Sequence, residues 1–126
     1  MDTIHEIIDA FAAKQREWRG DHDRAIVARA VMLAVYQHAV HAAVCARNAG
    51  LALDVRETSG NGIELVFRGR SARFRRGTSG AVWVHVVESD GATSADRRPT
   101  MPESVGGADD WAGEQVSEAL SVLMAT

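Results

Sequence analysis

Two histidines and the single cysteine stand close together in the longest apolar segment of the chain, residues 24–48. His38, His41 and Cys45 are spaced i, i+3 and i+7, so in an α-helix they lie on one face. Imidazole and thiolate are good zinc ligands, but zinc sites usually draw on two separated pairs of ligands. The sequence offers no second pair. We therefore predict that these three residues pack against neighbouring elements, and we expect neither a metal nor a cofactor.

A cysteine nucleophile is a related interpretation, because Cys45 follows His41 by four residues. A reactive thiolate needs an accessible, electropositive site, whereas the apolar pattern places Cys45 on a face expected to be buried. The sequence has no P-loop, no dinucleotide-binding glycine fingerprint, no H-E-x-x-H and no G-x-S-x-G motif. Because no catalytic signature is complete, we expect a non-enzymatic protein.

Residues 51–88 alternate between apolar and polar side chains with a period of two, as expected for strands with one buried face. The alternation predicts one set of inward side chains: Leu53, Ile63, Leu65, Phe67, Phe74, Val82, Val84 and Val86. It predicts a second set that points outward and includes most of the arginines of this region: Arg56, Arg68, Arg73, Arg75, Trp83 and His85.

Three interpretations of the outward set remain open. Arginines beside an exposed tryptophan are typical anchors of protein–protein interfaces. The same groups hold phosphates while an aromatic ring stacks on a base. The third interpretation is a solvated face whose arginines pair with Asp54, Glu64 or the acidic C-terminal segment.

The remaining elements follow from helical periodicity and from turn residues. Apolar side chains recur at helical spacing over residues 4–19, and Gly20 predicts the end of that helix. A second helix is expected over residues 24–48, with Gly50 as its stop, and a third over residues 110–125. Residues 89–109 contain both prolines and no apolar period, which predicts a long loop. The fold class is therefore α+β, in the order α-α-β-β-β-β-α, with a four-stranded antiparallel meander packed on a long central helix.

Composition indicates one ordinary domain over residues 1–126, with 46% apolar residues, 25% charged residues and a net charge of -3. The middle of the chain is basic and its end is acidic: residues 51–87 carry three acids and six arginines, and residues 88–126 carry eight acids and two arginines. The negative net charge argues against a generic nucleic-acid binder. The single cysteine fits a reducing cytosol, and Arg29, Gln37, His38 and His41 make a membrane span over residues 24–48 costly.

These observations favour a cytoplasmic, inhibitor- or chaperone-like module that occludes the surface of a partner protein through Trp83 and the arginines around it. A phosphate- or nucleic-acid-binding module that uses the same arginines is the alternative, and the metal site at His38, His41 and Cys45 is the third. We expect no membrane partner. Small residues along the central helix would let a second helix approach closely, which predicts a homodimer through this alanine-rich face: Ala28, Met32, Val35, Ala39, Ala42, Ala43 and Ala46.

Overall fold

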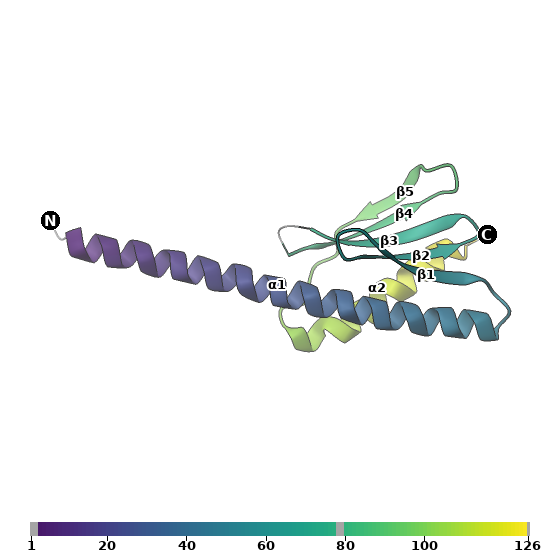
Figure 1. Cartoon of the computed structure of the whole chain (residues 1–126), viewed down its shortest axis with the longest axis horizontal. Helices are drawn as coiled ribbons and strands as arrows, with labels where there is room; N and C mark the ends of the chain where they lie inside the picture. The colour runs from purple at the N-terminus through teal and green to yellow at the C-terminus, as the bar shows by residue number, and fades with distance from the viewer. Residues whose placement is uncertain (1–2, 78–79, 126) are drawn as a thin grey trace.

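The N-terminal part of the chain forms a single long helix in the computed structural model, which describes residues 3–77 and 80–125. Helix α1 runs without interruption over Thr3–Asn48 (Figure 1). The predicted break at Gly20 is therefore wrong. A glycine inside a helix costs about 1 kcal/mol of stability relative to alanine, and the neighbouring helical turns offset this cost. Gly20 does not have a positive φ, so its backbone fits within the helix. Asp21 pairs with Arg24 within α1, across the position of the predicted break.

The predicted stop at Gly50 is correct, and its geometry explains why. Gly50 has a φ of 79°, the left-handed conformation that glycine adopts without a steric penalty. The amide of Leu51 donates to the carbonyl of Ala46 at 2.8 Å, and the amide of Gly50 donates to the carbonyl of Arg47 at 3.0 Å. This pair of bonds is the Schellman arrangement that closes the C-terminal end of a helix.

Five antiparallel strands follow: β1 (Leu53–Thr58), β2 (Gly62–Phe67), β3 (Arg70–Arg76), β4 (Val82–Val87) and β5 (Thr93–Arg97). They form one sheet in the order β1-β2-β3-β4-β5 (Figure 1). The α+β class and the antiparallel meander are as predicted, but the sheet has five strands and not four. The fifth strand was missed because its sequence, TSADR, has no apolar alternation. It forms an edge, where backbone pairing with β4 suffices and little side-chain burial is needed.

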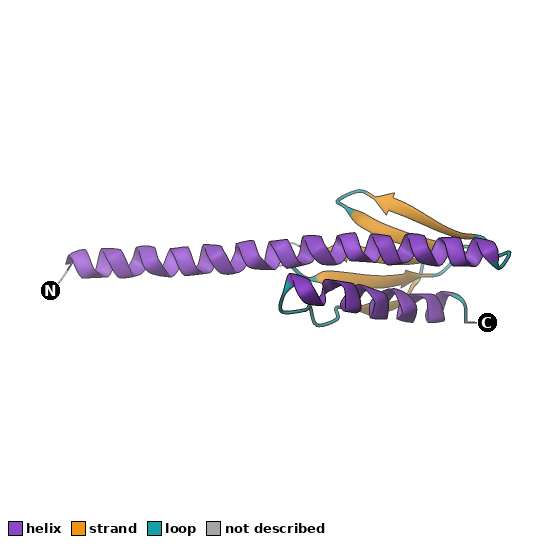
Figure 2. Ribbon diagram, turned by 90° about the horizontal axis from the view of Figure 1, so that it is seen from below, coloured by secondary structure: helices purple, strands orange, loops and turns teal. Residues whose placement is uncertain are grey.

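Both helices cover the same face of the sheet. A short 3-10 helix, η1 (Val105–Gly107), leads into α2 (Ala108–Leu123), which lies beside the C-terminal half of α1 (Figure 2). All eight side chains predicted to point inward are at most 6% exposed. They pack with Val31 and Val35 of α1 and with Trp111 and Val116 of α2 in one core. The predicted inner face of the sheet is thus confirmed.

An ion pair fastens the end of α2 to the sheet. Arg70 donates to both carboxylate oxygens of Glu88, at 2.7 and 2.9 Å, and to the carbonyls of Val122 and Leu123. These carbonyls belong to the last turn of α2, where acceptors have no donor from a following helical turn. The Val122 carbonyl also accepts from the Ala125 amide at 3.3 Å. The hydrogen bonds between the two side chains raise the pKa of Arg70 and lower the pKa of Glu88. Arg70 is therefore a structural residue.

The N-terminal half of α1 projects beyond the sheet and α2 (Figure 1). We call residues 3–22 the arm. None of its residues is buried, and the first buried residue of α1 is Ala28. At 1.5 Å per residue the arm is about 30 Å long. Burial of an apolar face thus holds the C-terminal half of α1 in place, whereas the arm has no such cover within its own chain.

Candidate protein-binding surfaces

One row of polar and charged side chains crosses the outer face of the sheet from edge to edge. The strand register places Arg56 opposite Glu64, Glu64 opposite Arg73, Arg73 opposite His85 and His85 opposite Asp96. Arg73 donates to Glu64 at 2.8 Å, and His85 Nδ1 lies 3.0 Å from Asp96. Opposite charges on facing positions stabilise neighbouring strands. Arg73 and His85, both predicted to bind a partner, are thus engaged with carboxylates of the sheet itself.

A second row on the same face has a different character. Arg75 pairs with Trp83 in the register, and the Arg98 guanidinium lies 5.3 Å from the Trp83 ring centre. In the described part of the chain, neither Arg75 nor Arg98 has a carboxylate oxygen within ion-pair distance. We call Arg75, Trp83 and Arg98 the Trp83 row. Beside it is an open hollow of about 330 Å³, lined by Arg75, Arg76, Gly77, Trp83, His85 and Asp96.

The structure places two arginines of this region where the sequence did not predict them. Arg68 was expected on the outward face of a strand, but it lies in the turn after β2 with a φ of 52°. Its guanidinium stands 5.1 Å from the ring centre of Phe67. Arg98 was not among the predicted site residues, because it lies within residues 89–109, which were expected to form a loop. Only the β4–β5 pairing brings it to Trp83.

The histidine–cysteine group of α1 is divided: His38 packs against α2, whereas His41 and Cys45 are exposed. His38 Nε2 is 2.9 Å from Asp109 of α2, and Gly113 of α2 lies close against the His38 ring. Cys45 is exposed, contrary to the prediction of a buried thiol, and its sulfur lies 3.6 Å from His41 Nε2. Across residues 3–77 and 80–125, no three His, Cys, Asp or Glu side chains are placed to hold a metal ion. The two histidines therefore face different neighbours.

The alanine-rich face of α1 lies inside the molecule. Ala28, Val35 and Ala39 are fully buried, and Met32 and Ala46 are 7% exposed. The sheet and α2 of the same chain cover this face. A homodimer, which stays a prediction, would need a different surface of α1 from the one that the small residues suggested.

Large apolar side chains are instead exposed along the opposite side of α1. Of the large hydrophobic residues that are exposed in the described chain, all but Leu51 and Val105 belong to this helix. We call them the α1 stripe: Ile4, Ile7, Ile8, Phe11, Trp18, Ile26, Leu33, Tyr36, Val40 and Val44. Trp18 is 62% exposed and stacks on His22 with ring centres 5.3 Å apart. Polar residues interrupt the stripe at Gln15, His22 and Arg29, and exposed apolar side chains in this number are typical of interaction sites.

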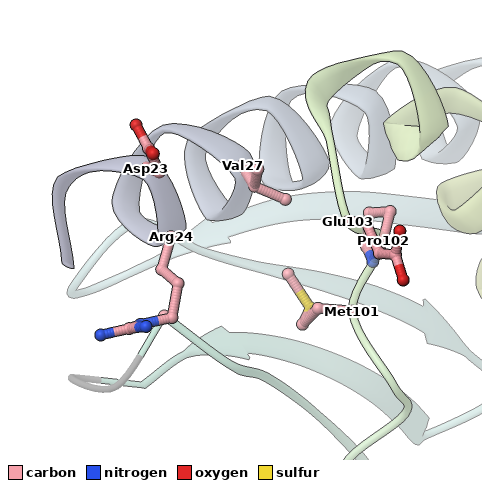
Figure 3. Close-up of a pocket in the computed structure, with 7 residues that line it drawn as sticks. Asp23, Arg24, Val27, Met101, Pro102 and Glu103 are labelled. Carbon is pink, nitrogen blue, oxygen red and sulfur yellow. The ribbon is translucent and has the colours of Figure 1, made fainter. Parts of the chain in front are cut away.

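A hollow of about 270 Å³ marks the point where the arm leaves the sheet and α2. Val27 of α1 and Met101 of the β5–η1 connection face one another across it, with Pro102 at its rim (Figure 3). The side chains of Asp23 and Arg24 point away from Met101 (Figure 3). The lining of the hollow combines apolar side chains with three charged residues, Asp23, Arg24 and Glu103. Because Asp23 and Arg24 point away from Met101, these charges do not converge on one point as the polar groups of a catalytic site do.

Comparisons with models of protein families, with curated proteins and with solved structures found no match to this chain. By length and composition, α1 is also apolar enough to cross a membrane. Core helices share this property, and 33% of its most apolar stretch is buried in the chain. The α1 stripe and the Trp83 row are therefore the two candidate binding surfaces of the described residues.

Proposed function

We propose that this protein is a non-enzymatic protein-binding module, and that the α1 stripe is its main binding surface. The observation that supports this proposal most directly comes from the arm. Five large apolar side chains, from Ile4 to Trp18, are each at least 60% exposed on a stretch of helix in which no residue is buried. Isolated helices of this length are only marginally stable in water. A partner that covers the stripe would bury these side chains and hold the arm helical.

The chemistry of the stripe favours a helical partner. Its side chains recur every three or four residues, the spacing by which amphipathic helices engage a groove or another helix. Trp18, Phe11 and Tyr36 are the aromatic types that anchor interfaces. In this proposal the protein acts by occupying a partner's apolar surface, as an inhibitor or a chaperone does, with α1 as the binding surface in place of the sheet face.

Capture of bound proteins from the source cells tests this proposal. Phe11→Glu together with Trp18→Glu places two charges in the stripe and should abolish recovery of the partner. Ala10→Glu together with Ala13→Glu is the matched control, since both residues are exposed on the arm and lie outside the stripe. Equal recovery with the stripe variant and the control would contradict the proposal, provided that circular dichroism shows both variants to be helical.

A second candidate function is recognition of phosphate or carboxylate groups by the Trp83 row. The observation that favours it is that Arg75 and Arg98 flank an aromatic ring and lack acidic partners among the described residues. Arginine binds phosphate through paired N–H donors, and a tryptophan ring stacks on bases. A protein partner with acidic side chains would use the same groups, with Trp83 as the anchor.

Retention on heparin and on single-stranded RNA at low salt tests the second candidate. Arg75→Ala together with Arg98→Ala should reduce the salt dependence of binding by about one unit of slope for each phosphate that is no longer neutralised. Arg56→Ala together with Arg73→Ala removes the same charge from the row that is paired with carboxylates, and should have a smaller effect. If wild-type protein is not retained at low salt, nucleic-acid binding is excluded.

A further inference from the structure

The α1 stripe runs straight along the whole helix. A line drawn along the stripe passes through positions three or four residues apart, from Ile4 to Val44. These 40 residues are covered in eleven steps, so the mean spacing is about 3.6 residues. Because this period equals that of a straight α-helix, the stripe does not wind around α1. Twelve positions lie on the line: 4, 8, 11, 15, 18, 22, 26, 29, 33, 36, 40 and 44.

The line falls into two halves of equal length. Positions 4–22 belong to the arm, and positions 26–44 belong to the part of α1 that packs on the sheet. Both halves are exposed on the stripe side: Ile8 is 60% exposed and Leu33 is 59% exposed. The chain therefore carries two parts of the stripe that are equal in length: the part on the arm (positions 4–22) and the exposed strip next to the sheet (positions 26–44).

From this match we infer that the occupant of the α1 stripe is a second copy of the chain, packed antiparallel with its two-fold axis near Arg24. The inference rests on the proposed function. In this arrangement the arm of each copy covers the exposed strip on the other copy. Positions whose numbers add to 47 or 48 face each other: Ile4 with Val44, Ile8 with Val40, Phe11 with Tyr36, Gln15 with Leu33, Trp18 with Arg29, and His22 with Ile26.

Charge favours the antiparallel arrangement over a parallel one. A parallel pair in register would place Arg29 of one copy against Arg29 of the other at the edge of the seam, and like charges in contact are unfavourable. The antiparallel pair separates the two Arg29 side chains and places each against the Trp18 ring of the other copy, a cation–π contact. The nearest like charge is then Arg19 of that copy, at the edge of the stripe. It also sets the two helix dipoles in opposition, which is the favourable direction.

The charges of the arm also argue against an anionic lipid surface as the occupant. Helices that lie on such membranes carry a strongly basic polar face. Residues 3–24 carry five acids and four bases, so the arm has no excess of positive charge. Binding to a second copy of the chain does not require an excess of positive charge.

The stripe is large enough for a stable dimer. A standard interface buries about 800 Å² per partner, and a fully buried aromatic side chain contributes roughly 150–250 Å². Three aromatic and seven aliphatic side chains, each 38–72% exposed, are available on each copy. The core side chains of α1 lie on the other side of the helix from the stripe. The β1–β2 hairpin borders the stripe at Leu33 and Tyr36, beside an open hollow of about 360 Å³, so a helix on the stripe would pack next to this hairpin there.

Cysteine crosslinking of full-length protein tests both the occupant and its direction. In a Cys45→Ser background, which removes the natural thiol, Ile8→Cys and Val40→Cys are prepared as separate proteins. We expect that neither protein forms a covalent dimer alone on oxidation, and that an equimolar mixture does. Ala13→Cys mixed with Val40→Cys is the matched control and should not crosslink, because Ala13 lies on the opposite side of the arm from the stripe.

Sedimentation of wild-type protein at micromolar concentration should give twice the mass of one chain. The Phe11→Glu/Trp18→Glu variant should give the mass of one chain. Crosslinking of Ile8→Cys with itself would overturn the antiparallel arrangement. A wild-type monomer that still needs the α1 stripe to capture another protein would overturn the second copy and leave the binding function standing. A monomer that captures without the stripe would overturn both.

Discussion

The two halves of α1 are both helical but have opposite surroundings. Residues 24–48 place valine and alanine against the sheet and α2, where Val31, Val35 and Ala39 are fully buried. Residues 3–22 place larger apolar groups on one side and bury none of them. Apolar pattern alone therefore does not tell which face of a helix is covered within its own chain. Here the small residues are covered by the chain, and the large residues are left exposed.

The largest expected difference between the two regions is in the cost of deleting a phenylalanine ring. Phe74 is fully buried and Phe11 is 64% exposed. Phe74→Ala should lower the free energy of unfolding by about 3–5 kcal/mol, because it leaves a cavity in the core. Phe11→Ala should change it by about 0.5 kcal/mol or less in dilute, monomeric protein. Urea denaturation followed by near-ultraviolet circular dichroism measures both, and equal losses would show that the arm is packed.

Replacing Gly20 or Gly50 by alanine should change stability by an intermediate amount, and in opposite directions at the two positions. Gly20 lies in the arm, and a Cβ there would come no closer than 3.5 Å to an Arg24 side-chain nitrogen. Gly20→Ala should stabilise the arm by about 1 kcal/mol, which hydrogen exchange would report as slower exchange of arm amides. Gly50→Ala should destabilise the chain by about 1 kcal/mol, because the φ of 79° at this helix end disfavours a side chain. Destabilisation by both changes would mean that the helix bends at Gly20.

The smallest expected effect concerns pH and the Arg70–Glu88 pair. Arg70 lowers the pKa of Glu88 below its ordinary value near 4.3. The pair therefore stabilises the fold fully above that ordinary value, and its contribution is lost as the pH falls through the lowered pKa. Glu88→Gln should lower the melting temperature at pH 7. At pH 3 the melting temperatures of the wild-type protein and the variant should differ less. Because the pair holds α2 and not the arm, exchange of arm amides should not change. A constant difference in melting temperature from pH 7 to pH 3 would contradict this assignment.

Much of the sheet was predictable, because alternation with a period of two directly reports which side chains face a core. Leu65, Phe74 and Val84 were placed correctly for this reason. The fifth strand was not predictable, because the segment around Ala95 pairs through its backbone and carries little apolar alternation. Arg98 was missed with it, since its approach to Trp83 depends on that pairing.

The α+β class, the inner face of the sheet and the helix end at Gly50 are all legible in the sequence, because each depends on local periodicity or on one residue's backbone preference. Which side of α1 is covered depends on the packed fold, because α2 comes from the far end of the chain and packs on the alanine-rich side. The packed fold also decides which arginines are paired across strands and which flank Trp83, because that depends on the register of five strands. The consequence is an uncovered arm with the large apolar residues of the α1 stripe exposed along one side.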